Sequence, residues 1–238
     1  MKTVLVTGGG GAIGAAICRR FKEHRVLVAD RNREAAERVA REVGGTALVF
    51  DISSYDDARK ALEGKTVDVL VNNAGWDRFQ NFVDTKPEEW DALIDINLRG
   101  PLNMHHLVVP GMLERSSGRI VNISSDAARV GSSGEAVYSA CKGGIIAFSK
   151  TLAREVARKG VTVNVVCPGP TDTPILRGFL GEGESGQKVY DALVRAIPMK
   201  RVGQPDDIPG IVAFLASDEA GFITGQVISV SGGLTMAG

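Results

Sequence analysis

The stretch Thr3-Val-Leu-Val-Thr-Gly-Gly-Gly-Gly-Ala-Ile-Gly14 decides the fold of this 238-residue chain. It opens on an apolar, β-branched run typical of a buried strand. The glycines then lead into a helical pattern with Ile13, Ile17 and Phe21 four residues apart. Such a turn lets the backbone approach a pyrophosphate closely, next to the free N–H groups and positive dipole end of a helix. The sequence predicts a phosphate-binding turn here; a tight strand-to-helix connection is the alternative.

Working outward, apolar runs alternate with helix-length segments along the whole chain. The predicted strands cover residues 3–6, 25–29, 46–50, 67–71, 119–123, 161–166 and 226–230. Strands that are apolar on both faces and separated by helices pair in parallel, with helices on both sides of the sheet. The prediction is a single α/β domain over residues 1–238, a Rossmann-like doubly wound parallel sheet of about seven strands.

Composition restricts the kinds of partner. The chain is 44% hydrophobic and 24% charged, and its 28 basic and 28 acidic residues leave no net charge. We therefore expect a small-molecule partner, neither nucleic acid nor a membrane surface. Cys18, Cys141 and Cys167 lack metal-ligand spacing and are interpreted as reduced thiols, with a catalytic cysteine as the alternative. We expect no metal. Without a signal peptide or an apolar run of membrane-spanning length, the expected location is cytoplasmic.

Acidic residues follow the second and third predicted strands. A carboxylate at Asp30 can accept hydrogen bonds from both ribose hydroxyls of an adenosine and would repel a 2′-phosphate. Arg31 follows and could soften that repulsion. NAD is therefore favoured over NADP. Asp51 could bind the adenine amine or cap the helix that comes next, and both uses stay open.

Amide side chains follow the fourth strand and interrupt a later helix. Asn72-Asn-Ala-Gly75 can hold a neighbouring turn or the cofactor ribose, with a structural role expected for Asn72. Asn97 lies inside a long helical pattern that begins near Pro87. Asparagine has a low helix propensity in the interior of a helix. We expect a buried water or a backbone partner for it, and an exposed helical asparagine is the alternative.

A strand end and a helix bring together three residues suited to acid–base chemistry. The strand at 119–123 runs into Ser124 and Ser125, while Tyr138 and Lys142 are four residues apart on one helical face. The spacing of Ser132 and Glu135 predicts a capping box that starts this helix. An ammonium one turn away could stabilise the anion of a phenol, and a serine could hydrogen-bond a substrate oxygen.

The sixth strand leads into a stiff loop and then a longer excursion. Cys167-Pro-Gly-Pro-Thr-Asp-Thr-Pro174 could press on a nicotinamide ring and offer Thr171 or Thr173 to its carboxamide. Residues 175–199, rich in glycine and charge through 178–186 and helical after that, are interpreted as a mobile flap over the substrate. A surface excursion is the alternative.

Together, these ordered motifs resemble the short-chain dehydrogenase/reductase family over essentially the whole chain. The resemblance implies a tetrad of Asn97, Ser125, Tyr138 and Lys142. Tyr138 would be the general acid/base, Ser125 would orient the substrate oxygen, Lys142 would lower the phenol pKa and hold the nicotinamide ribose, and Asn97 would fix a relay water. It also implies a homotetramer. The residues expected to contact NAD are Gly8, Gly11, Ala12, Ile13, Gly14, Asp30, Asp51, Ile52, Asn73, Ala74, Gly75, Tyr138, Lys142, Pro168, Gly169, Thr171 and Thr173.

A finer resemblance, to 2-hydroxycyclohexanecarboxyl-CoA dehydrogenases, is carried by residues 73–77, 104–106 and 125–138. It implies oxidation of a ring alcohol beta to a coenzyme A thioester, with Trp76, Arg129 and the flap lining the substrate pocket. The arginines that could meet coenzyme A phosphates are Arg78, Arg129, Arg177 and Arg195. The alternatives are a 3-oxoacyl carrier-protein reductase, a simple cyclic or aryl alcohol dehydrogenase, and a dinucleotide-sensing regulatory protein without catalysis.

Overall fold

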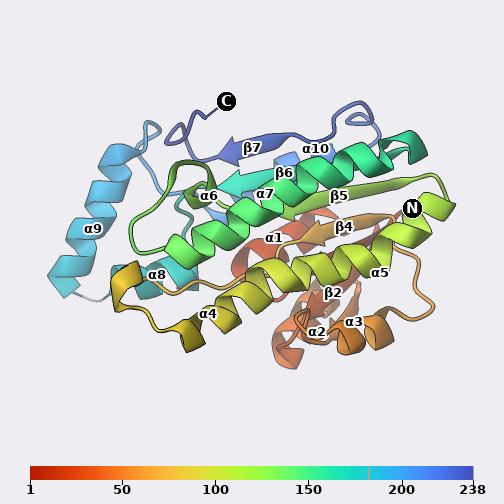
Figure 1. The fold of residues 1–238 in the computed structure, drawn as a ribbon, viewed down its shortest axis with the longest axis horizontal. Coiled ribbons are helices and arrows are strands. Elements are labelled where there is room, and N and C mark those ends of the chain that lie inside the picture. The colour runs from red at the N-terminus through yellow and green to blue at the C-terminus, as the bar shows by residue number, and fades with distance from the viewer. Residues whose placement is uncertain (182, 238) are drawn as a thin grey trace.

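One seven-stranded parallel sheet organises the molecule (Figure 1). The computed structural model describes residues 1–181 and 183–237. The strands are β1 (Thr3–Thr7), β2 (Arg25–Asp30), β3 (Thr46–Val49), β4 (Val69–Asn72), β5 (Gly118–Ile123), β6 (Val161–Pro168) and β7 (Val227–Val230), in the order β3-β2-β1-β4-β5-β6-β7. All neighbours pair in parallel. The predicted strands and the doubly wound fold are confirmed.

Helices cover both faces of the sheet. They are α1 (Ala12–Arg20), α2 (Arg33–Val43), α3 (Tyr55–Leu62), α4 (Pro87–Ile94), α5 (Gly100–Glu114), α6 (Ala127–Val130), α7 (Ala136–Val156), α8 (Pro174–Leu180), α9 (Gly183–Ala196) and α10 (Pro209–Leu215). Helices α1, α2 and α10 pack on one face and α3, α5 and α7 on the other, so the sheet separates two hydrophobic cores. None of the helices in the described residues is long and apolar enough to cross a bilayer.

The strand order creates a crevice between β1 and β4. From β1 the chain moves outward through β2 and β3, then returns to the opposite side of β1 to begin β4. The connections after β1 and β4 therefore diverge to opposite faces of the sheet. In sheets of this kind, ligands bind at the carboxyl ends of the strands beside this reversal.

A buried polar network lies just below that edge. Asn72 and Asn122 are paired in the β4–β5 register, and Nδ2 of Asn72 donates to Oδ1 of Asn122 over 2.9 Å. Nδ2 of Asn122 donates to the hydroxyl of Ser149 on α7 over 2.8 Å. Burial lowers the pKa of His105 to about 4, so its ring is neutral, with Nδ1–H donating to the Pro101 carbonyl and Nε2 accepting from Asn122. These contacts agree with the structural role expected for Asn72, because its side chain joins β4 to β5.

Helix α7, which carries Tyr138 and Lys142, begins at Ala136 without the predicted capping box. Glu135 occupies the N-cap position, and no side chain caps the helix. Ser132 contributes only its backbone carbonyl, which accepts from the Glu135 N–H over 3.2 Å. The capping-box prediction is therefore wrong, and the carboxyl of Glu135 points to other partners.

Candidate active site

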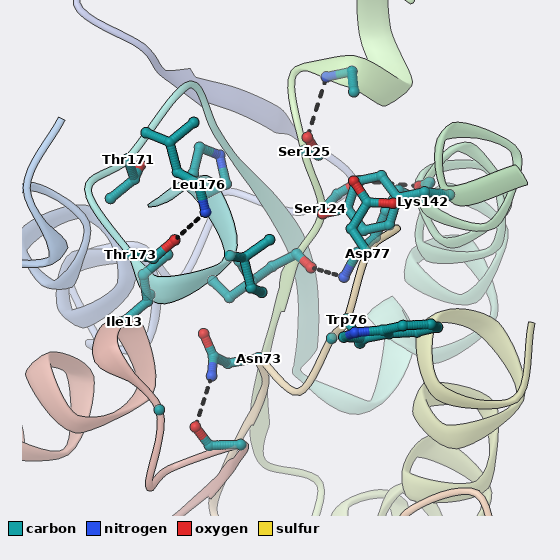
Figure 2. Close-up of a pocket in the computed structure, with 18 of the residues that line it drawn as sticks. Ile13, Asn73, Trp76, Asp77, Ser124, Ser125, Lys142, Thr171, Thr173 and Leu176 are labelled. Carbon is teal, nitrogen blue, oxygen red and sulfur yellow. Dashed lines mark hydrogen bonds between the residues drawn. The ribbon is translucent and has the colours of Figure 1, made fainter. Parts of the chain in front are cut away.

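A cavity of about 790 Å³ opens at the carboxyl edge of the sheet. Turns that follow the first six strands line it, together with the start of α7 and residues of α8 and α9. All seventeen residues expected to contact the dinucleotide line this cavity, and so does Ser125. Asn97 is fully buried and lies behind the wall. Figure 2 shows lining residues from these separate elements turned toward one space.

The glycine turn is built for close approach. Gly8 has a φ of +62°, in the left-handed region that favours glycine. A side chain on Gly14 would place its Cβ 2.0 Å from the Gly8 carbonyl oxygen, so α1 packs against the turn as only glycine allows. Gly11 is the N-cap of α1 and offers no side chain to cap it. The first N–H groups of α1 therefore stay available for an anion, and the turn fits a pyrophosphate.

Asn73 fastens the end of β4 to this turn. Its Nδ2 donates to the carbonyl oxygens of Thr7 and Gly8 over 3.0 and 3.1 Å. The Thr7 hydroxyl accepts from the backbone N–H groups of Asn73 and Ala74, both over 3.1 Å. Figure 2 shows the Asn73 side chain reaching across this junction. The amide thus holds the neighbouring turn, one of the two uses that the sequence left open.

The acidic residues after β2 and β3 each have a backbone role and also line the cavity. Oδ2 of Asp30 accepts from the Gly10 N–H over 3.0 Å, and Oδ1 accepts from the Asn32 N–H over 2.9 Å. Oδ1 of Asp51 accepts from the backbone N–H and the hydroxyl of Ser53. The cap of α3 itself is Ser54, so Asp51 orders the turn before the helix.

A second cation near Asp30, Arg38, had no signal in the sequence. Arg38 on α2 donates through Nη2 to the Gly10 carbonyl over 3.2 Å, which brings a guanidinium to the glycine turn. Only the position of α2 beside that turn reveals this contact. Arg31 lines the cavity as well, so two cations lie at the same end as Asp30.

The two serines after β5 have different surroundings. Ser124 is buried, and its hydroxyl donates to the Lys142 carbonyl over 3.0 Å, which ties β5 to α7. The Ser125 hydroxyl lines the cavity and accepts from the Ala127 N–H over 3.2 Å at the start of α6. Both serines line the cavity, and Ser125 remains the one predicted to meet a substrate oxygen.

Tyr138 and Lys142 line the same wall. The Lys142 ammonium lies 5.6 Å from the centre of the Tyr138 ring and donates to the Ile123 carbonyl over 3.1 Å. Burial raises the pKa of Tyr138, the carboxyls of Asp77 and Glu135 raise it further, and the Ser125 hydroxyl opposes them. Lys142 was expected to lower the pKa of this phenol, but in this structure burial prevails. Burial also lowers the pKa of Lys142 to about 8.

Asn97 lies in a π-helical turn, Asp95–Arg99, between α4 and α5. Its Nδ2 donates to the Trp76 and Leu93 carbonyls over 2.7 and 3.0 Å, and its Oδ1 accepts from the Trp76 N–H over 3.2 Å. The expected backbone partner is therefore present. A Cβ on Gly75 would lie 3.1 Å from both Oδ1 of Asn97 and Nζ of Lys142, so Gly75 separates these two groups.

The segment after β6 forms part of the cavity wall. The Thr171 hydroxyl donates to the Gly169 carbonyl over 2.9 Å, and the Thr173 hydroxyl accepts from the Leu176 N–H over 3.3 Å and so caps α8 (Figure 2). The ring of Phe179 on α8 lies 3.8 Å from that of Phe79, centre to centre. Helix was expected only after the glycine-rich stretch 178–186, but α8 covers 174–180 and α9 already begins at Gly183. Within the predicted flap, Glu182 lies outside the described residues.

The four arginines suggested for coenzyme A phosphates do not line the cavity. Arg78 pairs with Glu89 over 2.7 Å, and Arg177 pairs with Asp172 over 2.7 Å. Arg129 donates to the Ser229 hydroxyl over 2.8 Å and to the Ala237 carbonyl, so it holds the C-terminal segment and is not part of the pocket wall. Trp76, in contrast, lines the pocket as predicted.

Known proteins share this architecture along their whole length. The family model described as Enoyl-(Acyl carrier protein) reductase matches residues 10–235. An acetoacetyl-CoA reductase of Shinella zoogloeoides is 44% identical, with 98% of each chain covered. A 3-oxoacyl-[acyl-carrier-protein] reductase of Thermotoga maritima is 34% identical over 99% of this chain and 98% of its own. A 3-oxoacyl-[acyl-carrier protein] reductase of Brucella melitensis, solved with bound NAD, superposes with a TM-score of 0.91 at 33% identity, covering 99% of this chain and 92% of its own.

A parallel sheet with a glycine turn at its reversal and a tyrosine, lysine and serine at the adjoining strand ends defines a dinucleotide-dependent oxidoreductase. With the family model matched over nearly the whole chain, the chain belongs to the short-chain dehydrogenase/reductase family, whose members are NAD(P)-dependent oxidoreductases.

Proposed function

We propose that this protein interconverts a secondary alcohol and a ketone beta to an acyl thioester, with NAD as its cofactor. The observation that carries the proposal is the meeting of the Tyr138 phenol, the Ser125 hydroxyl and the Lys142 ammonium in the same cavity as the glycine turn. The relatives named above are reductases of acetoacetyl-CoA and of 3-oxoacyl carrier protein, which points to a β-oxoacyl thioester.

The tetrad residues divide the work around the reacting oxygen. NAD, which the glycine turn and Asp30 would hold, would supply hydride-transfer chemistry at the carbinol carbon. Tyr138 exchanges a proton with the substrate oxygen, and Ser125 donates a hydrogen bond to it. Because burial raises the pKa of Tyr138, the phenol holds its proton at neutral pH and is ready to donate it to a ketone. Lys142 offers its ammonium to the cofactor ribose, and Asn97 holds the Trp76 backbone beside it.

The substrate end of the cavity is mainly apolar. Its walls come from the loop after β4 and from α8 and α9; the apolar side chains are Trp76, Phe79, Ile175, Leu176, Phe179 and Leu193. Surfaces of this kind bind hydrocarbon by removing it from water. We propose a cyclic acyl group, such as a 2-hydroxycyclohexanecarboxyl thioester. A short linear acyl group, as in acetoacetyl-CoA, is the second candidate, favoured by the relative at 44% identity.

Steady-state kinetics with matched substrates test this function. NADH oxidation is followed with 2-oxocyclohexanecarboxyl-CoA, acetoacetyl-CoA, and the simple ketones cyclohexanone and acetone. We expect the highest kcat/KM for the cyclic thioester and much lower values for the simple ketones. Equal kcat/KM for thioesters and simple ketones would refute the thioester assignment, and a preference for acetoacetyl-CoA would replace the ring by the linear acyl group.

The cofactor preference is expected to depend on Asp30. The wild type should give a higher kcat/KM with NADH than with NADPH, because the carboxylate repels a 2′-phosphate. In Asp30→Asn the amide oxygen can still accept from Gly10, the Asn32 N–H loses its acceptor and the charge is gone, so the preference should fall by about tenfold, which corresponds to about 1.4 kcal/mol. Arg31→Ala is the matched control and should strengthen the preference for NADH. A wild-type preference for NADPH would show that Arg31 and Arg38 outweigh the carboxylate.

We also propose a homotetramer in the cytoplasm. The three cysteines are free and buried, in keeping with a reducing compartment. Gly144 approaches Leu98 within the chain, where a Cβ would lie 3.3 Å from its Cδ1, whereas a Cβ on Gly143 would meet nothing nearer than 4.0 Å. Gly143, which has no close neighbour at this position within the chain, is therefore the glycine of the pair that we expect to contact another copy of the chain. Light scattering of the purified protein measures the oligomeric state.

A further inference from the structure

Two carboxyl groups face each other in the cavity wall beside Tyr138. Asp77 lies in the loop after β4, and Glu135 directly precedes α7. Both line the cavity, and the carboxyl of Glu135 is close enough to Asp77 to raise the pKa of Asp77. Their loops are tied by the N–H of Gln80, which donates to the Gly134 carbonyl over 2.9 Å. Neither carboxyl has a role in the tetrad or at the glycine turn.

The groups around this pair compensate its negative charge only in part. From the same loop, Arg78 turns its guanidinium to Glu89 over 2.7 Å and gives Asp77 only its backbone N–H, over 2.7 Å. From α7 the pair is faced by the phenol of Tyr138 and by the ammonium of Lys142, which donates to the Ile123 carbonyl. Within the described residues, neither carboxyl forms a salt bridge. Figure 2 shows Asp77 next to Lys142 above Trp76.

Two neighbouring carboxyls favour sharing a proton, because two carboxylates close together repel one another. Burial and the neighbouring carboxyl of Glu135 raise the pKa of Asp77 to about 7. Near neutral pH, the pair therefore offers one O–H donor and carries one negative charge. This combination favours an uncharged carbonyl oxygen and opposes a carboxylate.

We propose that Asp77 and Glu135 form a proton-sharing pair that hydrogen-bonds the acyl carbonyl oxygen of the substrate and excludes the corresponding free acid. The proposal rests on the proposed function, because it concerns the second oxygen of a β-oxoacyl group whose first oxygen meets Tyr138 and Ser125. The pair lines the same cavity as Tyr138 and acts on its pKa, so a second oxygen next to the reacting one would approach this part of the wall. Glu135 and Asp77 thereby set specificity for the thioester, and they do not take part in the exchange of the substrate proton.

Kinetics with a thioester and its free acid test the pair. The wild type should lose kcat/KM for acetoacetyl-CoA as the pH rises through about 7, and it should use acetoacetate poorly at all pH values. In Asp77→Asn the amide donor does not titrate, so this loss near pH 7 should disappear. The double variant Asp77→Asn/Glu135→Gln removes the charge, so kcat/KM for acetoacetate should rise by at least about tenfold. Asp91→Asn, on the exposed face of α4, is the control and should match the wild type.

A stability measurement tests the shared proton without turnover. An unfolded aspartate loses its proton near pH 4, whereas folded Asp77 holds it up to about pH 7, so the folded state binds more protons between these values. Folding stability therefore falls as the pH rises through this window, and Asp77→Asn removes that penalty. The gain in Tm of Asp77→Asn over the wild type should be larger at pH 8 than at pH 5.

The outcomes separate this proposal from the function. If thioesters are not turned over but the Tm gain depends on pH as described, the proposed function fails and the shared proton stands. A Tm gain that is the same at pH 5 and pH 8 overturns the pair. If the double variant turns over acetoacetyl-CoA normally but still rejects acetoacetate, the role of the pair in specificity is overturned. A wild-type preference for an ammonium-bearing ketone over acetoacetyl-CoA would overturn that role as well.

Discussion

Replacing Tyr138 by phenylalanine should lower kcat by about 10²–10⁴-fold, the usual contribution of a positioned general acid or base. The ring would still fill its place on α7, but no phenol would remain to exchange a proton with the substrate oxygen. Because the hydroxyl faces the cavity and the glycine turn is a separate element, NADH should still bind. Single-turnover absorbance measures the chemical step, and the fluorescence of bound NADH measures the affinity.

Tyr55→Phe is the matched control for this substitution. In the wild type the Tyr55 hydroxyl forms a hydrogen bond with Nδ1 of His106 over 2.8 Å. This contact lies on the surface between α3 and α5, away from the cavity. The control loses a phenol and a hydrogen bond and should keep its turnover. Substantial activity in Tyr138→Phe, with the control unaffected, would remove Tyr138 from the acid/base role.

The second large effect is expected at the glycine turn. In Gly14→Ala the new Cβ would come within 2.0 Å of the Gly8 carbonyl oxygen, so α1 must move away from the turn. Overpacking of this kind costs about 1–3 kcal/mol, and each kcal/mol lowers Tm by about 2–4 °C in a chain of this size. The displaced N–H groups should also weaken NADH binding at least about tenfold. Thermal denaturation and titration with NADH measure the two effects.

Gly210→Ala is the control at another helical glycine and should change the stability in the opposite direction. A Cβ at Gly210 on α10 meets nothing within 4 Å, so alanine should add up to about 1 kcal/mol of stability through helix propensity. NADH affinity should not change. If Gly14→Ala proved as harmless as this control, the close packing of α1 on the turn would not be needed for binding.

The fold was predictable because its signals are local and repeated. Each strand is a short apolar run, and each reaches the same sheet edge, so the residues that follow the strands gather in one place without any tertiary information. This is why one cavity is lined by residues that lie at the ends of different strands or open the first helix, namely Gly8, Gly11, Asp30, Ser125 and Thr171. The boundaries shift by up to two residues, as at Val69, because pairing with neighbours decides where a ladder ends.

The site was less predictable wherever contacts cross between elements. The side chain of Glu135 has the spacing of a helix cap, but it lies against Asp77, a partner 58 positions earlier in the chain. The burial that raises the pKa of Tyr138 depends on packing that no spacing records. A π-helical turn carries Asn97, and its three bonds to the backbone become visible only once Trp76 is in place. The substrate itself depends on wall shape, which the order of residues does not express.

The amide pair beneath the cavity also determines how two strand ends line up. Asn72 and Asn122 lie directly opposite each other, one residue below Asn73 and two below Ser124. Sliding β4 along β5 by one residue would displace their ends by about 3.3 Å and turn one amide to the wrong face of the sheet, leaving its polar atoms buried among hydrocarbon. Two uncharged side chains that contact no reactant thus fix the register of β4 and β5. This register in turn sets the distance between the glycine turn and the hydroxyl of Ser125.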